Sequence, residues 1–428
     1  MAAIVETSEE DLALAVVRFT SELAWADAGP EIAENQVARL CQEAQEFVVM
    51  GRWVDLASLM LTSADLVFSR VSDKDLDCIY TVICNLVTKA GSPDEAMEIA
   101  DRICIKITQQ PNKKPETEQP NEEDEIVQPI EKPALRLKIL FNLYNLLEHP
   151  YSRFFVYEKA LELAIRGKVT ESILPSFKKI DNFLKEWEIG PLEQRRLFLK
   201  ISNVLGEIKS SSKEYFSFLT KYLATFSNED AHTMSKAKPA AERAIFEFVK
   251  APDMFQCDLL DMPAVRQLEK DGKYALAFQL LKIFLTQRLD AYLDFQAANS
   301  TLLKSHGLVH EECITKMRLM SLVDLSSNGS SEIPYAMIRD TLRIKDDEVE
   351  YWVVRAISAK LLDCKMDQMN ETVIVSRHTE RMFGPSQWEV LRLRLEEWRA
   401  NVTNALRTIQ YNKASEEAPQ SLQGGMIR

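Results

Sequence analysis

The stretch IKDDEVEYWVVRAISAKLLDCKMDQMNETVIVS, residues 344–376, decides the fold of this chain. Apolar residues recur at helical spacing over 349–361, behind acidic residues at 346–350, where the helix dipole favours negative charge. The period then changes to two over 362–366, and a β-branched run follows at 372–376. We therefore predict a helix followed by a β-hairpin. The residues expected on the inner face and rim of that helix are Val349, Trp352, Val353, Ala356, Ile357, Lys360 and Leu361.

Two further helices are predicted upstream of this stretch. The first has apolar residues from Met317 to Leu325 and should stop at Asn328-Gly329, residues that tolerate positive φ. The second is shorter, with Pro334 in its first turn and an apolar face made by Met337, Ile338 and Leu342. The order helix, helix, helix, strand, turn, strand is that of a winged helix, which we expect over residues 306–380.

This pattern resembles the PCI domain, a scaffold module shared by the proteasome lid, the signalosome and translation initiation factor 3. The matching motifs are Asp347-Glu348-Val349-Glu350, Ala356-Ile357, Lys365-Met366-Asp367-Gln368 and Val373-Ile374-Val375. The flanking segments 277–295, 307–322 and 378–398 look most like a subunit of initiation factor 3. The resemblance extends from about Leu192 to about Leu406.

The resemblance implies a non-catalytic scaffold subunit that supports assembly of the pre-initiation complex on the small ribosomal subunit. Its implied partners are the PCI and MPN subunits of initiation factor 3, contacted through PCI surfaces and a helical bundle. A PCI subunit of the signalosome or of the proteasome lid would share this architecture and is the alternative.

Composition agrees with a helical scaffold. The chain has 428 residues, 46% of them hydrophobic, and only 12 glycines, and it contains no GxGxxG or GxxxxGK[ST] motif. A formal net charge of -13 disfavours non-specific binding to nucleic acid. Seven cysteines without a CxxC pair, and the lack of a long apolar run, favour a cytoplasmic protein that does not contact the membrane.

Capping signals divide the rest of the chain into paired helices. Ser8 with Asp11, Ser72 with Asp75, and Ser92 before Pro93 are expected to start helices, and Gly51 and Gly91 to end them. We predict an α-solenoid of antiparallel helix pairs that leads into the winged helix. The expected parts are N-terminal helical repeats at 1–108, an acidic proline-rich disordered insert at 109–133, further helical repeats at 134–305, the winged helix at 306–380, a C-terminal bundle helix at 386–411 and a disordered tail at 412–428.

The insert at 109–133 is rich in proline and carboxylates and has few apolar residues. Such a segment buries too little apolar surface to offset the entropy of ordering it, so its removal should leave the fold intact. A tail that binds a partner is the other interpretation.

The C-terminal helix carries the candidate binding residues. Its apolar residues alternate at spacings of three and four, the seam of helices that pack side by side. These residues are Trp388, Leu391, Leu395, Trp398, Val402, Ala405 and Ile409. The seam either folds back on its own winged helix or meets a partner, and the resemblance favours a partner, because PCI subunits gather their C-terminal helices into a shared bundle. Trp388 and Trp398 are the expected anchors.

No catalytic residue, cofactor site or metal site is predicted. His306, His310 and Cys313 have a spacing that superficially suits zinc and a hydrolase, but Gly307 favours a loop there. The carboxylates at 346–350 lack a neighbouring His, and they would repel DNA phosphates from a recognition helix. Direct contact with ribosomal RNA stays open. The basic residues that would make it are Arg377, His378, Arg381, Arg392 and Arg394.

Overall fold

The computed structural model describes residues 11–109, 130–208, 212–227, 229–327, 332–382 and 384–416. The chain divides into two compact units, residues 1–211 and residues 212–428. Four sequence predictions fall outside the described residues: the cap at Ser8, the insert over 110–129, the stop at Asn328-Gly329, and the tail over 417–428.

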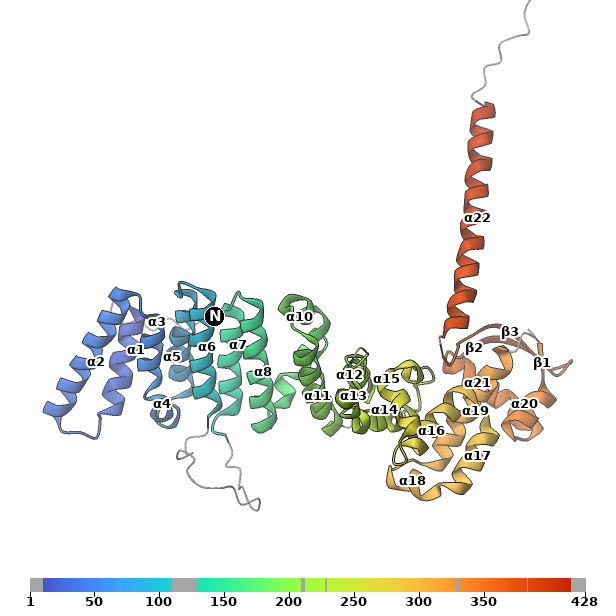
Figure 1. Cartoon of the computed structure of the whole chain (residues 1–428), viewed down its shortest axis with the longest axis horizontal. Helices are drawn as coiled ribbons and strands as arrows, with labels where there is room; N and C mark the ends of the chain where they lie inside the picture. The colour runs from blue at the N-terminus through green and yellow to red at the C-terminus, as the bar shows by residue number, and fades with distance from the viewer. Residues whose placement is uncertain are drawn as a thin grey trace, which may run out of the picture. The chain divides into compact units, whose positions relative to one another are not determined.

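The first unit consists of helices packed side by side in pairs (Figure 1). Neighbouring helices pack in the pairs α1 with α2, α3 with α6, and α7 with α8. The helices are α1 Leu12–Ala24, α2 Pro30–Met50, α3 Trp53–Leu61, α4 Ala64–Arg70, α5 Asp73–Asn85, α6 Pro93–Thr108, α7 Pro133–Leu146, α8 Pro150–Arg166, α9 Leu174–Phe177, α10 Ile180–Trp187 and α11 Pro191–Glu207, with short 3-10 turns at Leu86–Thr88 and Thr170–Ser172.

The predicted capping residues account for several of these boundaries. Ser72 and Ser92 each accept a hydrogen bond from a backbone amide of the first turn, at the starts of α5 and α6. Gly51 ends α2 with a φ of 70°, a left-handed conformation that glycine adopts without steric cost. At the start of α1 the cap is Asp11, whose carboxylate accepts from the amide of Ala13 at 2.8 Å.

A buried arginine joins the two sides of the insert. Arg136 of α7 donates from Nη1 to the carbonyl of Ile107 at 2.6 Å and from Nε to the carbonyl of Glu131 at 2.9 Å. Its guanidinium also lies 3.8 Å from the ring centroid of Phe68. The described residues resume at Ile130, which is buried and lies ahead of the predicted boundary at 133. The ends of the insert are therefore held together by one side chain.

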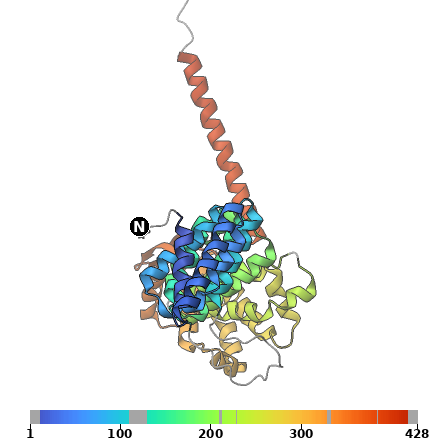
Figure 2. The same cartoon turned by 90° about the vertical axis from the view of Figure 1, so that its left-hand side faces the viewer.

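The second unit starts with helices and ends in a winged helix and one long helix. Figure 2 gives a second view of the chain, with α22 in red. The elements are α12 Ser212–Ala224, α13 Ala231–Ser235, α14 Lys238–Lys250, α15 Pro263–Arg266, α16 Ala275–Thr286, α17 Leu289–Ala298, α18 Ser300–Ser305, α19 His310–Ser327, β1 Glu332–Pro334, α20 Tyr335–Leu342, α21 Val349–Ser358, β2 Leu362–Asp367, β3 Thr372–His378 and α22 Pro385–Glu416, with 3-10 turns at Leu259–Asp261, Gln267–Lys270 and Asp346–Glu348.

The winged helix packs α19, α20 and α21 against a three-stranded antiparallel sheet of order β1-β3-β2. Its core includes Leu322, Ile338, Leu342, Trp352 and Val373, all of them buried. The predicted fold class is confirmed: helical repeats are followed by a winged helix. The third helix of the winged helix, α21, is preceded by a 3-10 turn over the acidic residues Asp346–Glu348.

The structure corrects the winged-helix prediction in three places. A strand, β1, precedes α20, and Pro334 is its last residue rather than a residue of the helix. Met337 is exposed, because α20 turns Ile338 and Leu342 inward instead. Lys360 follows α21 with a φ of 58° and is exposed, so the helix ends before it.

Candidate protein-interaction surface

The candidate interaction surface lies on α22, a helix of 32 residues that continues past the predicted end at Tyr411 to Glu416. Its predicted apolar seam is exposed along the whole helix. Trp388, Leu395 and Trp398 keep 61%, 54% and 67% of their surface accessible. We call the set Trp388, Leu391, Leu395, Trp398, Val402, Ala405 and Ile409 the α22 seam.

The large apolar side chains of the α22 seam each keep 38% or more of their surface accessible in the described part of the chain. The seam therefore does not fold back on the winged helix, which was the other interpretation of its spacing. Large apolar residues that gather on one face and stay exposed mark an interaction site in a soluble protein. Two tryptophans on that face supply the side chains that most often anchor protein interfaces.

Arg381 fixes the chain just ahead of α22. Its Nε donates to the carbonyl of Met320 at 2.9 Å, Nη2 donates to the same carbonyl, and Nη1 donates to the carbonyl of Gln287 at 2.6 Å. Burial lowers the pKa of Arg381 to about 10, while Asp324 raises it and Arg288 lowers it. Arg381 thus links α19 to the end of α16 from a buried position. It is not the RNA-facing residue that the sequence suggested.

Three of the other predicted basic residues have acidic neighbours. Arg377 pairs with Asp363 at 3.1 Å across the β2–β3 hairpin. His378 Nε2 lies 3.1 Å from a carboxylate oxygen of Glu380. Arg392 pairs with Glu389 at 2.9 Å and lies 3.7 Å from Glu396. These pairs reduce the positive charge that this region can offer to a phosphate backbone.

The acidic residues at the start of α21 form hydrogen bonds with other residues of the winged helix. Asp346 accepts from Arg339 at 2.9 Å, and the hydrogen bonds that Arg339 donates to Asp340 and Asp346 raise the pKa of Arg339. Glu350 accepts from Gln368 in the hairpin turn at 2.7 Å and from the hydroxyl of Tyr335 at 3.4 Å. These carboxylates connect parts of the winged helix, which is a structural use.

The histidines considered for zinc have separate environments. The His306 ring stacks on Phe246 with centroids 3.8 Å apart, and the His310 ring lies against Tyr292, whose hydroxyl is 3.1 Å from Nδ1. Cys313 is buried, and burial raises the pKa of its thiol. Over the described ranges, no three His, Cys, Asp or Glu side chains are placed to hold a metal ion together.

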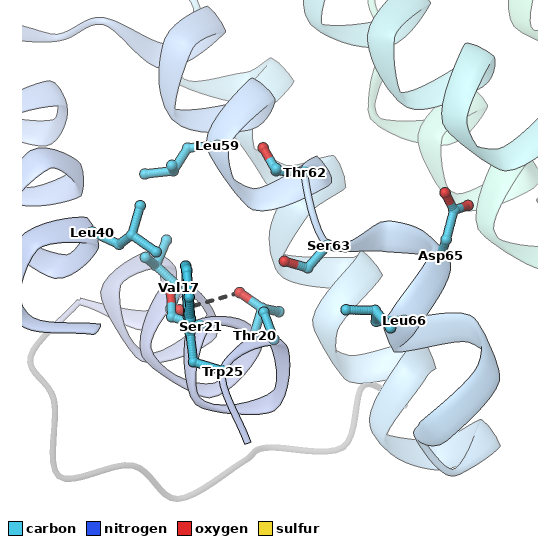
Figure 3. A pocket seen from close by; sticks show the side chains of 11 residues that line it. Val17, Thr20, Ser21, Trp25, Leu40, Leu59, Thr62, Ser63, Asp65 and Leu66 are labelled. Atoms are coloured by element: carbon cyan, nitrogen blue, oxygen red, sulfur yellow. Dashed lines mark hydrogen bonds between the residues drawn. The ribbon is translucent and has the colours of Figure 1, made fainter. Parts of the chain in front are cut away.

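A pocket of about 480 Å³ lies among α1 to α4 in the first unit (Figure 3). Two hydroxyl groups of its lining donate hydrogen bonds to backbone carbonyls. Thr20 Oγ1 donates to the carbonyls of Val16 and Val17, and Thr62 Oγ1 donates to that of Ser58. Asp65, the carboxylate in the lining, lies away from Thr20 in this view. The pocket therefore shows no pairing of a nucleophile with a base.

None of the described helices combines the length and apolar character needed to span a bilayer.

The α22 seam is a prediction from sequence, whereas the role of Arg381 just ahead of the helix is not predicted from sequence. Heptad spacing identifies a seam directly, whereas the bonds of Arg381 go to backbone carbonyls 94 and 61 residues away along the chain. A hydrogen bond to such a distant carbonyl leaves no local pattern, so no signal in the sequence marks it.

Comparison with known families and proteins agrees with these features. Residues 286–377 match the PCI domain, and residues 381–409 match the family described as eIF3 subunit M, C-terminal helix. The chain is 33% identical to eukaryotic translation initiation factor 3 subunit M of Dictyostelium discoideum, over 81% of this chain and 82% of that protein. The proteins of the same name from Homo sapiens and Gallus gallus are 25% and 26% identical, over 95% and 84% of this chain and 97% and 89% of those proteins.

Proposed function

The chain belongs to the family of eukaryotic translation initiation factor 3 subunit M, and from this premise we propose that it is a non-catalytic scaffold subunit of translation initiation factor 3. The observation that carries the proposal is the exposed α22 seam, which coincides with the segment matched by the C-terminal helix family. The signalosome and the proteasome lid are not favoured, because the similar proteins of Dictyostelium discoideum, Gallus gallus and Homo sapiens are all named for initiation factor 3.

In this proposal α22 packs against helices of other subunits of the factor. The seam alternates at spacings of three and four, the repeat that lets two helices stay in contact along their length. Truncating a buried tryptophan at the centre of an interface typically costs about 2 kcal/mol or more, so Trp388 and Trp398 should dominate the affinity.

The winged helix supplies the second kind of contact. PCI surfaces on this subunit would meet those of neighbouring PCI subunits, and MPN subunits would join through the bundle. The factor as a whole, acting in the cytoplasm, would carry this subunit to the small ribosomal subunit and support assembly of the pre-initiation complex there. The ion pairs of Arg377 and Arg392 and the burial of Arg381 favour indirect contact with ribosomal RNA.

A non-catalytic role fits the chemistry of the described residues. The carboxylates of the winged helix bond to Arg339, Gln368 and Tyr335, and His306 and His310 stack on aromatic rings. A zinc hydrolase would need one metal ion per chain. Elemental analysis of the purified chain should find less than a tenth of that amount. One zinc per chain that is lost in the His306→Ala, His310→Ala variant would instead support the zinc hydrolase.

The test of the scaffold role replaces Trp388, Leu395 and Trp398 together by Ala. Because these side chains are exposed in the chain alone, the isolated variant should keep its circular dichroism and its urea midpoint. It should fail to recover the other subunits of initiation factor 3 when it is purified from cells.

The matched control carries three Ala substitutions on another face of the same helix, at Arg392, Glu396 and Thr403. These residues are exposed too, so this variant should assemble normally. Normal assembly of the seam variant, or its unfolding in isolation, would show that α22 does not bind partners through the seam.

A further inference from the structure

The junction between α16 and α17, residues 287–289, is bonded to α19. Arg288 Nε donates to a carboxylate oxygen of Asp324 at 2.6 Å. The backbone amide of Leu289 donates to the hydroxyl of Ser321 at 3.1 Å, and both of these residues are buried. Hydrogen bonds that are shielded from water are stronger than exposed ones, so these bonds hold the junction and α19 together.

Arg381 adds a link from the segment that leads into α22. Its guanidinium donates to the carbonyl of Gln287, which is the C-cap residue of α16, and to the carbonyl of Met320 in α19. Arg381 is itself buried. The α16–α17 junction, α19 and the approach to α22 therefore meet at one guanidinium group.

A second residue holds the approach to α22 from the side of the winged helix. The backbone amide of Thr379 donates to the carbonyl of Leu361 at 2.9 Å, and its hydroxyl donates to the carbonyl of Lys360 at 3.2 Å. Thr379 directly follows β3, and Arg381 comes two residues later. The chain is thus bonded at two points before α22 begins.

The start of α22 allows little change of direction after Arg381. Pro385, four residues farther on, is the first residue of the helix, and its ring fixes φ. The amide of Gly384 donates to Gln387 Oε1 at 3.1 Å, and the carbonyl of Gly384 accepts from the amide of Trp388 at 3.1 Å. These bonds cap the first turn, so the orientation of α22 depends on the few residues that join it to Arg381.

We propose that Arg381 is a positioning residue, which holds the base of α22 in one orientation relative to the other helices of the second unit and so presents the α22 seam already aligned for its partners. The proposal rests on the proposed function, in which the seam binds other subunits. A helix whose base swings spends only part of its time in the binding orientation, and its apparent affinity falls by that fraction. Loss of Arg381 therefore weakens assembly although every seam residue is unchanged.

Arg318 provides a matched comparison within the same unit. Its Nε donates to the carbonyl of Leu342 at 3.0 Å and its Nη2 donates to that of Arg343 at 3.2 Å, at the end of α20. Arg318→Met therefore removes a guanidinium group that binds two backbone carbonyls, as Arg381→Met does. The bonds along the approach to α22 are not affected by this change.

The first test measures the distance between two spin-labelled amino acids in the full chain, one at Glu312 of α19 and one at Glu397 of α22, both of which are exposed. The chain with no other change and its Arg318→Met variant should each give one narrow distribution of distances. Arg381→Met should give a broader one, because α22 then samples several orientations. Circular dichroism and urea titration establish that each variant is folded under the conditions used. An equally narrow distribution in Arg381→Met, or a broad one without it, would overturn the proposal.

The second test lets each tagged variant compete with the wild-type chain for a place in the complex in cells. Arg381→Met should be incorporated about ten-fold less than wild type, the loss expected if the binding orientation is occupied a tenth of the time. Arg381→Lys should fall between the two, because one ammonium group replaces a fork of donors that reaches two carbonyls. Arg318→Met should be incorporated normally.

The same competition separates failure of the proposal from failure of the scaffold role. Equal incorporation of Arg381→Met and Arg318→Met, whether normal or reduced, would refute positioning by Arg381. The scaffold role would stand in that case, provided that the triple variant at Trp388, Leu395 and Trp398 is excluded from the complex. If the triple variant were also incorporated normally, assembly through the α22 seam would be refuted as well.

Discussion

Replacing residues 110–129 by a six-residue Gly-Ser linker should make the first unit more stable. Arg136 donates to the carbonyls of Ile107 and Glu131 from one rigid guanidinium group, so the two oxygens lie no more than about 8 Å apart. Six residues span up to about 20 Å, which is enough to join Gln109 to Ile130 without moving either helix.

The magnitude follows from the entropy of loop closure. Each doubling of loop length costs about 0.6 kcal/mol, so shortening this loop about three-fold should add about 1 kcal/mol to the free energy of unfolding. For a unit of this size that corresponds to a rise in Tm of about 2–4 °C.

The matched variant removes residues 109–133 and inserts the same linker. It loses the buried side chain of Ile130 and the carbonyl of Glu131 that Arg136 binds. It also loses the bonds from Lys132 to the carbonyl of Val71 and to Asp73, both at 2.9 Å. Burial of one isoleucine is worth about 1.5–3 kcal/mol, so this variant should be less stable than the wild type by about 3 kcal/mol.

Thermal and urea unfolding of the full chain, followed by circular dichroism, distinguishes the two deletions. The shorter deletion should raise Tm and the longer deletion should lower it. If the shorter deletion lowered Tm by several degrees, residues 110–129 would pack on the unit and the entropic reasoning would be refuted. If the longer deletion were neutral, the contacts of Ile130 and Lys132 would contribute nothing measurable.

Two further predictions concern buried cations in the second unit. Arg381→Met should lower the free energy of unfolding by about 2–4 kcal/mol in urea titrations, because the carbonyls of Met320 and Gln287 lose charged donors; an unchanged midpoint would contradict this. Burial lowers the pKa of Lys316 to about 7 from 10.5, so above pH 7 the unfolded chain binds a proton that the folded chain lacks. Stability should therefore rise between pH 7 and 8.5 by up to about 1.4 kcal/mol per unit, and Lys316→Met should flatten that rise in urea titrations across this range.

Local signals in the sequence were enough to predict most of the architecture. Ser72 and Ser92 form side-chain caps, and Gly51 adopts the left-handed conformation, because these roles depend only on residues within one turn. The core of the winged helix followed from the change of period between Trp352 and Val373, and both of these residues are buried.

The features that the sequence did not predict have a common physical cause: they depend on partners that lie far away along the chain. Strand β1 has only three residues, and its pairing with β3 determines it rather than any propensity of its own. Arg381 and Lys316 look like surface cations in sequence, yet both are buried against backbone carbonyls: Arg381 binds those of Met320 and Gln287, and Lys316 binds those of Phe248 and Ala251.

The isolation of α22 has a consequence for how quickly its backbone exchanges hydrogen with the solvent. A helix of 32 residues is about 48 Å long, and with its apolar seam exposed it depends mainly on its own hydrogen bonds and surface ion pairs for stability. Its amides should exchange with deuterium far faster than those of α21, whose inner face is buried. Once partner helices cover the seam, the same amides should become protected, so exchange in α22 directly reports the fraction of the protein that has been incorporated into the complex.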